Sequence, residues 1–139
     1  MKKPFLLFAL KFSVIIYFAA CTSIDHYTIG RTATPIVTKG VWKVNYFSAA
    51  DNDRTKDLSG YTFIFRSSGT IKATRNGVET NGKWFEDEIA NRVSIDLGTT
   101  DPSLKKINGQ WNILDIGISN IGFQDNNKTF DEKLSIAML

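Results

Sequence analysis

The stretch Gly40-Val41-Trp42-Lys43-Val44-Asn45-Tyr46 decides the fold, because apolar and polar side chains alternate along it. Successive side chains of an extended strand point to opposite faces, so this pattern predicts a strand that is buried on one face and solvated on the other. The same period of two recurs at several later places, at residues 62–65, 71–74, 93–97, 111–113 and 134–138. The chain therefore predicts an all-β domain of antiparallel strands.

Turn-forming residues separate the alternating runs. Asn76-Gly77 favours a tight hairpin, because both residues tolerate a positive φ, and Asp101-Pro102 suits the start of a helical turn over Ser103–Ile107. Eight short strands at this spacing predict a closed up-and-down barrel, with a β-sandwich as the alternative. We expect them at residues 41–48, 61–66, 70–75, 79–86, 91–97, 109–115, 120–125 and 130–138.

Residues 1–20 have the layout of a secretory signal peptide, with a basic start, an apolar middle and the small pair Ala19-Ala20 at the end. A membrane-spanning helix needs about 20 apolar residues, and Lys11 interrupts this run. The three lysines of the leader also account for the formal net charge of +3, since the rest of the chain has 14 basic and 14 acidic residues. We therefore expect no nucleic-acid partner.

Cys21 directly follows the small pair, which is typical of a bacterial lipoprotein signal, although Phe18 stands where Leu, Val or Ile is usual. An unpaired cysteine in an exported chain needs an explanation, and acylation supplies one. We expect a lipidated Cys21 that anchors the chain to a membrane, followed by a flexible Thr-rich tether over residues 21–39. Within it, Ile36 and Val37 are able to start a strand. The barrel domain then occupies residues 40–139.

Each of the three tryptophans stands two residues after a glycine. Filling of the core by the indole and close approach at the glycine explain this pattern; stacking of the indole on a ligand is the alternative. An eight-stranded barrel is either filled by side chains or holds one small ligand. The residues we expect to face the interior, as candidates for binding a small apolar ligand, are large: Trp42, Tyr46, Phe63, Phe65, Trp84 and Trp111.

The order of these short patterns behind a lipoprotein leader resembles the small lipocalin-like lipoproteins of Bacteroidetes envelopes. The patterns are Gly40-Val41-Trp42, Gly60–Phe65, Ser68-Gly69-Thr70, Asn81–Trp84 and Gly109-Gln110-Trp111. The resemblance implies an eight-stranded calycin-type barrel in which Trp42 closes one end of the core. Many lipocalins place an Arg near the last strand, where this chain has only Lys128 and Lys133. The ligands of well-studied lipocalins are therefore not implied.

The side chains needed for common catalytic and metal sites are absent from the predicted domain. The single His, His26, and the single Cys, Cys21, both precede it, which excludes Ser-His-Asp and Cys-His catalysis and the usual zinc sites there. The acids of the loop after residue 50 lack the glycine and the final Glu of a calcium loop. We expect no enzyme activity, no cofactor and no metal; a hydrolase would need two acids buried in a cleft.

The long loop from Ala49 to Gly60 offers an alternative function. Loops on a rigid barrel are common binding surfaces, so the domain could act as an interaction module that contacts another envelope protein or a glycan. For either function we expect the protein at the outer membrane, facing the periplasm, because Thr22, Ser23 and Ile24 separate Cys21 from the first acidic residue.

Overall fold

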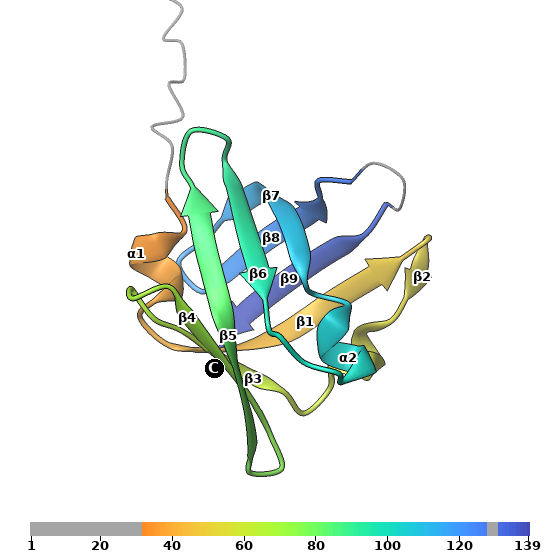
Figure 1. Ribbon diagram of the computed structural model, residues 1–139. Helices are drawn as coiled ribbons and strands as arrows, with labels where there is room; N and C mark the ends of the chain where they lie inside the picture. Colours follow the sequence, from red (N-terminus) through yellow and green to blue (C-terminus); the bar gives the residue numbers. More distant parts are fainter. Residues whose placement is uncertain (1–31, 128–130) are drawn as a thin grey trace, which may run out of the picture.

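Strands make up just over half of the residues that the computed structural model describes, which are 32–127 and 131–139 (Figure 1). The predicted leader, Cys21 and His26 lie outside these residues. The strands are β1 (Val41–Ala49), β2 (Asn52–Asp53), β3 (Thr62–Phe65), β4 (Thr70–Arg75), β5 (Val78–Asp87), β6 (Arg92–Asp96), β7 (Gly109–Ile116), β8 (Asn120–Asp125) and β9 (Lys133–Met138). The helical turn α1 (Thr34–Val37) precedes the first strand. The 3-10 turn η1 (Thr55–Leu58) lies between β2 and β3, and the helical turn α2 (Pro102–Lys105) lies between β6 and β7.

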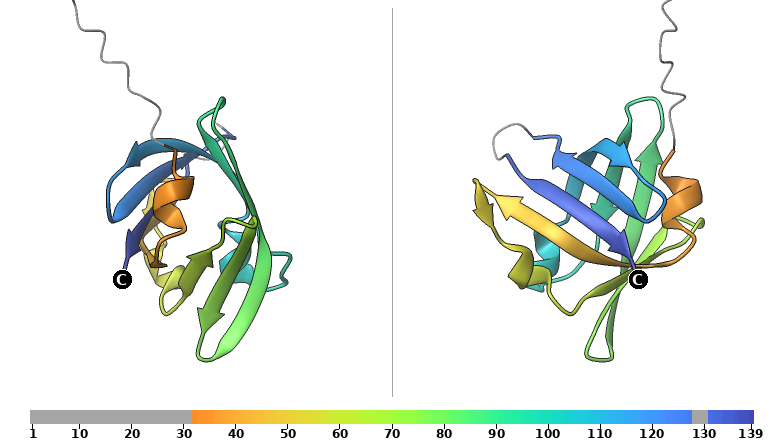
Figure 2. Two further views of the ribbon diagram at one scale, coloured as in Figure 1. Left: turned by 90° about the vertical axis from the view of Figure 1, so that its left-hand side faces the viewer. Right: turned by 180° about the vertical axis from the view of Figure 1, so that it is seen from behind.

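The strands form one antiparallel sheet that closes on itself. From β3 onward each strand pairs with the next, and β1 pairs with both β3 and β9. Figure 2 shows the sheet curving round until β9 lies beside β1. β2 adds only two residues beside the end of β1. The predicted eight-stranded barrel is confirmed, and closure decides against the sandwich.

The seam between β1 and β3 is the shortest ladder of the barrel. Only Val41 and Trp42 of β1 pair with β3, whereas pairing with β9 continues along β1 as far as Ser48. Beyond Trp42 the two strands separate, and the segment that carries β2 and η1 runs through the gap (Figure 1). This separation creates the groove described below.

The three tryptophans lie in the core, with 0 to 6% of their surface exposed. Each indole N–H donates to a main-chain carbonyl: Trp42 to Val37, Trp84 to Arg66 and Trp111 to Ile107, at 2.7, 2.8 and 2.9 Å. Buried polar groups need such partners, so each indole both fills the core and fastens a turn or loop to the barrel. At Gly82 the close approach is also real, because a Cβ there would lie 2.2 Å from the Asp96 carbonyl oxygen.

The interior position predicted for Tyr46 is wrong. Its side chain is 42% exposed, while that of Phe47 is 1% exposed. The register between β1 and β9 shifts between Val44 and Tyr46, so that Asn45 is an extra residue. One extra residue reverses the alternation beyond it, and Phe47 takes the inward place.

The strand start predicted at Ile36 and Val37 is also wrong. These residues belong to the helical turn α1, which has Pro35 in its first turn, a position that suits proline. Ala33 and Val37 are buried in the core. The Glu86 carboxylate accepts hydrogen bonds from the main-chain N–H groups of Ala33 and Thr34, at 2.6 and 2.8 Å. The packed domain therefore begins before Gly40, inside the expected tether.

The helical turn predicted after Asp101-Pro102 is confirmed as α2. Asp101 accepts hydrogen bonds from the N–H groups of Ser103 and Leu104, at 2.8 and 3.4 Å, which is the arrangement of an N-terminal cap. Leu104 is fully buried, so the turn covers one end of the core.

Candidate functional site

Five of the six predicted ligand-binding side chains lie in the core. Trp42, Phe63, Phe65, Trp84 and Trp111 are at most 6% exposed, and the Phe65 and Trp84 rings meet edge to face with centroids 5.4 Å apart. None of the five lines the groove described next, and Tyr46 points outward. The prediction that the five contact a ligand remains a prediction.

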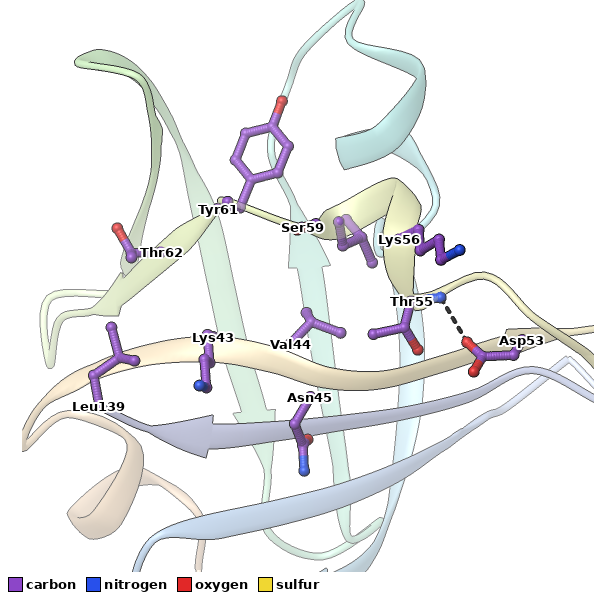
Figure 3. Close-up of a pocket in the computed structure, with 12 residues that line it drawn as sticks. Lys43, Val44, Asn45, Asp53, Thr55, Lys56, Ser59, Tyr61, Thr62 and Leu139 are labelled. Atoms are coloured by element: carbon purple, nitrogen blue, oxygen red, sulfur yellow. Dashed lines mark hydrogen bonds between the residues drawn. The ribbon is translucent and has the colours of Figure 1, made fainter.

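An open groove lies between β1 and the segment that runs from η1 into β3 (Figure 3). We call it the β1–η1 groove. Its volume is about 810 Å³, within the roughly 300–1,000 Å³ common for small-molecule sites. It is lined by Lys43, Val44, Asn45, Asp53, Thr55, Lys56, Leu58, Ser59, Gly60, Tyr61, Thr62 and Leu139.

The floor of the groove is apolar and its rim is polar. Val44, Leu58 and Tyr61 are 9%, 1% and 5% exposed, and Figure 3 shows Val44 on the side of β1 that faces η1. Lysine, asparagine and serine side chains surround this floor. An apolar floor with a few polar groups is the usual composition of a ligand pocket.

The main chain of Val44 adds a donor and an acceptor to the groove. Val41 accepts from the N–H of Leu139 at 2.9 Å, on the β9 side, and the main chain of an antiparallel strand faces its two neighbours alternately. Trp42 and Val44 therefore face the β3 side, where the ladder stops at Trp42. The Val44 N–H and C=O are left facing the space where β3 has separated from β1.

An ionic and aromatic cluster fixes the end of the groove near Tyr61. The Tyr61 hydroxyl donates to Asp101, and the Arg75 guanidinium lies 4.1 Å from the Tyr61 ring centroid and 3.5 Å from the Asp101 carboxylate. Burial, and then this hydrogen bond, raise the pKa of Tyr61, while the same hydrogen bond lowers the pKa of Asp101. The cluster joins the start of β3 to the end of β4 and to α2.

A second ionic contact holds η1 in place. The Asp57 carboxylate accepts from Lys106 and, at 2.9 Å, from Arg54, and these two hydrogen bonds lower the pKa of Asp57. Lys106 directly follows α2, so the contact ties η1 to the α2 end of the barrel. One wall of the groove is therefore anchored at two points.

Two acids of this loop, Asp53 and Asp57, are engaged within the protein. Thr55 donates its main-chain N–H to Asp53 at 2.9 Å, and hydrogen bonds from Thr55 lower the pKa of Asp53. Among residues 32–127 and 131–139, no three His, Cys, Asp or Glu side chains are grouped in a way that could hold a metal ion. Within the same residues, no helix has the length and apolar character needed to cross a membrane.

The sequence carried one signal of the groove that the prediction did not use. Leu58 is an apolar residue inside a long polar loop, and its burial shows that the loop folds back on the barrel. The separation of β1 from β3 has no comparable signal in the sequence.

Comparison with solved structures places the barrel among known folds. A DUF4847 family protein from Bacteroides vulgatus has a TM-score of 0.58 and 15% identity, covering 76% of this chain and 96% of that one. A lipocalin-like protein from Bacteroides uniformis has a TM-score of 0.55 and 14% identity, covering 73% and 98%. An uncharacterized protein from Bacteroides eggerthii has a TM-score of 0.51 and 12% identity, covering 72% and 98%.

The sequence itself matches no family model and no curated protein. At identities of 12 to 15% the structural likeness shows a shared fold and nothing about function. It confirms the resemblance predicted from the sequence: the chain has the lipocalin-like barrel found in Bacteroides proteins.

Proposed function

We propose that this protein is a lipid-anchored lipoprotein of the bacterial envelope, at the outer membrane facing the periplasm. In this proposal its barrel binds a small apolar ligand and catalyses no reaction. The β1–η1 groove carries the binding proposal, because it combines an apolar floor with a volume of about 810 Å³. The leader and Cys21 carry the anchoring proposal.

The groove suits a ligand with an apolar body and one hydrogen-bonding group. Leu139, which is 66% exposed, and the accessible edges of Val44 and Tyr61 offer apolar surface, and the Val44 main chain offers a donor and an acceptor beside it. A polar group on the ligand would satisfy main-chain groups that the separated β3 does not reach. The ionic contacts of Asp57 and Asp101 keep the walls in place, which lowers the entropy cost of binding.

Blocking the groove tests the binding proposal. Ser59 is exposed and lines the groove, whereas Ser67 is exposed in the turn after β3 and does not. We expect the protein to bind the amphiphilic fluorescent probe anilinonaphthalene sulfonate through its aromatic rings, Ser59→Trp to weaken this binding by at least about tenfold, and Ser67→Trp to leave it unchanged. Equal binding by the two variants would place the probe elsewhere and contradict the proposal.

Replacing the cysteine tests the anchoring proposal. In Cys21→Ser the acceptor for lipid is lost, so we expect no incorporation of labelled fatty acid and loss of the mature form from the membrane fraction. Unchanged labelling and fractionation would refute lipidation.

A second candidate is the interaction module, and the edge of β1 that β3 leaves unpaired beyond Trp42 favours it. An extended peptide can pair with unpaired main-chain groups at a sheet edge, and Val44 offers such groups. A photocrosslinking amino acid at Ser59, activated in intact cells, separates the two candidates. An adduct of small mass supports ligand binding, and an adduct the size of a protein supports strand addition.

A further inference from the structure

A second pocket, of about 750 Å³, lies where α1 meets the turn between β7 and β8 and the end of β9. Figure 2 shows α1 beside this turn in both views. Met138 donates its main-chain N–H to the carbonyl of Ser119 at 2.8 Å, which brings the end of β9 against the turn. We call this site the α1–turn pocket.

The lining of the α1–turn pocket is mainly apolar. Pro35 and Ile36 come from α1, Met138 from β9 and Ile118 from the turn. Ile36 and Met138 are partly buried against the core, but Ile118 is 87% exposed. A large apolar side chain at the tip of a turn, next to further apolar surface, is typical of a contact site.

The charge of this pocket is suited to a phospholipid. Among residues 32–127 and 131–139, Lys39 is the one ionisable side chain that lines it, and no acid does. A lysine beside apolar surface can lay its methylene chain on that surface and place its ammonium group at the level of lipid phosphates. A cation beside apolar side chains offers contacts for both the headgroup and the acyl regions of a bilayer.

The described part of the chain begins on the face that carries the α1–turn pocket. Thr32, the first described residue, also lines the pocket. Cys21 lies eleven residues earlier, so a fully extended segment could separate it from Thr32 by at most about 40 Å. A lipid on Cys21 would therefore keep this end of the barrel near the membrane.

We propose that the α1–turn pocket docks on the surface of the anchoring membrane. In this arrangement Ile118 inserts among the acyl chains and Lys39 contacts a lipid phosphate. This inference rests on the lipid anchor of the proposed function, and it adds an orientation: the side of the barrel that carries α1 faces the bilayer, and the β4–β5 hairpin projects from a different part of the barrel (Figure 1).

Depth-dependent quenching tests the orientation. Cys21 is the only cysteine of the chain, so with its thiol acylated a new cysteine is a unique labelling site. The lipidated protein, carrying Ser119→Cys with a nitrobenzoxadiazole label, is reconstituted in phosphatidylethanolamine–phosphatidylglycerol vesicles that contain doxyl lipids. The control is the same label at Val78→Cys, since Val78 is 69% exposed at the start of β5.

We expect the label at position 119 to be quenched several-fold more strongly than the label at position 78. Equal quenching at the two positions, or none at position 119 in protein that floats with the vesicles, would overturn the orientation. A blue-shifted label at position 119 that does not respond to doxyl lipids would show that protein covers the pocket, which also overturns it. Protein that fails to float, in contrast, would count against the lipid anchor itself.

A charge at the turn provides a second test in the same vesicles. Ile118→Glu places a carboxylate where the proposal requires an acyl environment, so we expect it to reduce quenching at position 119 several-fold. Val78→Glu is the matched control and should leave it unchanged. If Ile118→Glu had no effect on quenching, the insertion of Ile118 would be wrong.

Discussion

The indole N–H of Trp42 donates to the main-chain carbonyl of Val37 across 2.7 Å within the core. Trp42 belongs to β1 and Val37 ends α1, and both are at most 2% exposed. The bond therefore fastens the turn before the first strand to the barrel interior. Trp111 makes the corresponding bond to Ile107, just after α2, so the same device holds the two helical turns that flank the core.

Shortening Trp42 tests this device. Trp42→Ala removes the indole from a closed core and is expected to cost about 3–5 kcal/mol of unfolding free energy. Trp42→Phe keeps an aromatic ring but leaves the Val37 carbonyl without its donor. The unpaired carbonyl should lower the free energy of unfolding by about 1–3 kcal/mol. Urea denaturation measures both. Phe85→Ala is the control, since Phe85 is 65% exposed. A cost for Trp42→Ala as small as that of the control would contradict the place of the indole in the core, and an equally small cost for Trp42→Phe would contradict the role of the bond.

Glu86 is the second anchor of α1, and its removal should free the turn. Its carboxylate accepts three hydrogen bonds, from the N–H groups of Ala33 and Thr34 and from the Thr34 hydroxyl at 2.5 Å. Hydrogen bonds to a charged group contribute about 1.5–3 kcal/mol. In Glu86→Ala we expect faster amide hydrogen exchange at residues 33–39, with β6 to β8 unchanged. The matched control is Glu88→Ala, an exposed acid in the following turn; equal exchange in both variants would refute the anchor.

The strands could be predicted from the sequence because most of them follow a local rule. Ile71 and Ala73, or Val93 and Ile95, alternate with polar residues and are buried as expected. The turn at Asn76-Gly77 has positive φ at both residues, as the turn chemistry requires. Periodicity and turn residues are properties of short segments, so they are visible without the fold.

The features that were missed depend on contacts between distant segments. The bulge at Asn45 depends on the pairing of β1 with β9, in which Tyr46 lies opposite Ser135, 89 residues later in the chain. α1 is a single turn that depends on Glu86 and Trp42, and a turn of this length is not stable alone. The β1–η1 groove likewise arises where two strands separate, which no local pattern encodes.

The bulge predicts that two neighbouring aromatic residues contribute very different amounts to the free energy of unfolding. Phe47 is buried at 1% exposure and Tyr46 is 42% exposed, so Phe47→Ala should cost about 3–5 kcal/mol. Tyr46→Ala should cost less than about 1 kcal/mol, because its side chain stays in water. Urea denaturation of the two variants in parallel gives the comparison. Uninterrupted alternation along β1 predicts the reverse order, so a larger loss for Tyr46→Ala would show that β1 has no bulge.

The hydrogen bond between Tyr61 and Asp101 should make stability depend on pH at both extremes. Hydrogen bonding by Tyr61 lowers the pKa of Asp101 in the folded state. Its contribution is therefore complete above the ordinary Asp pKa of about 3.9 and is lost as pH falls through the lower folded value. Burial and the same bond raise the pKa of Tyr61, so that contribution is complete below about pH 10 and is lost as pH rises through the raised value.

Tyr61→Phe removes this bond while keeping the ring under Arg75. We expect the variant to be less stable than the wild type near neutral pH, with a difference that shrinks as pH falls below about 4 and again as pH rises above about 10. Urea denaturation of both proteins across pH measures the difference. Asp53 and Asp57 also have lowered pKa values, but their contributions to stability are the same in both proteins and cancel in the difference. Tyr46→Phe, at an exposed tyrosine, should parallel the wild type; a Tyr61→Phe deficit that stays constant from acid to alkaline pH would show that the hydroxyl acts only through packing.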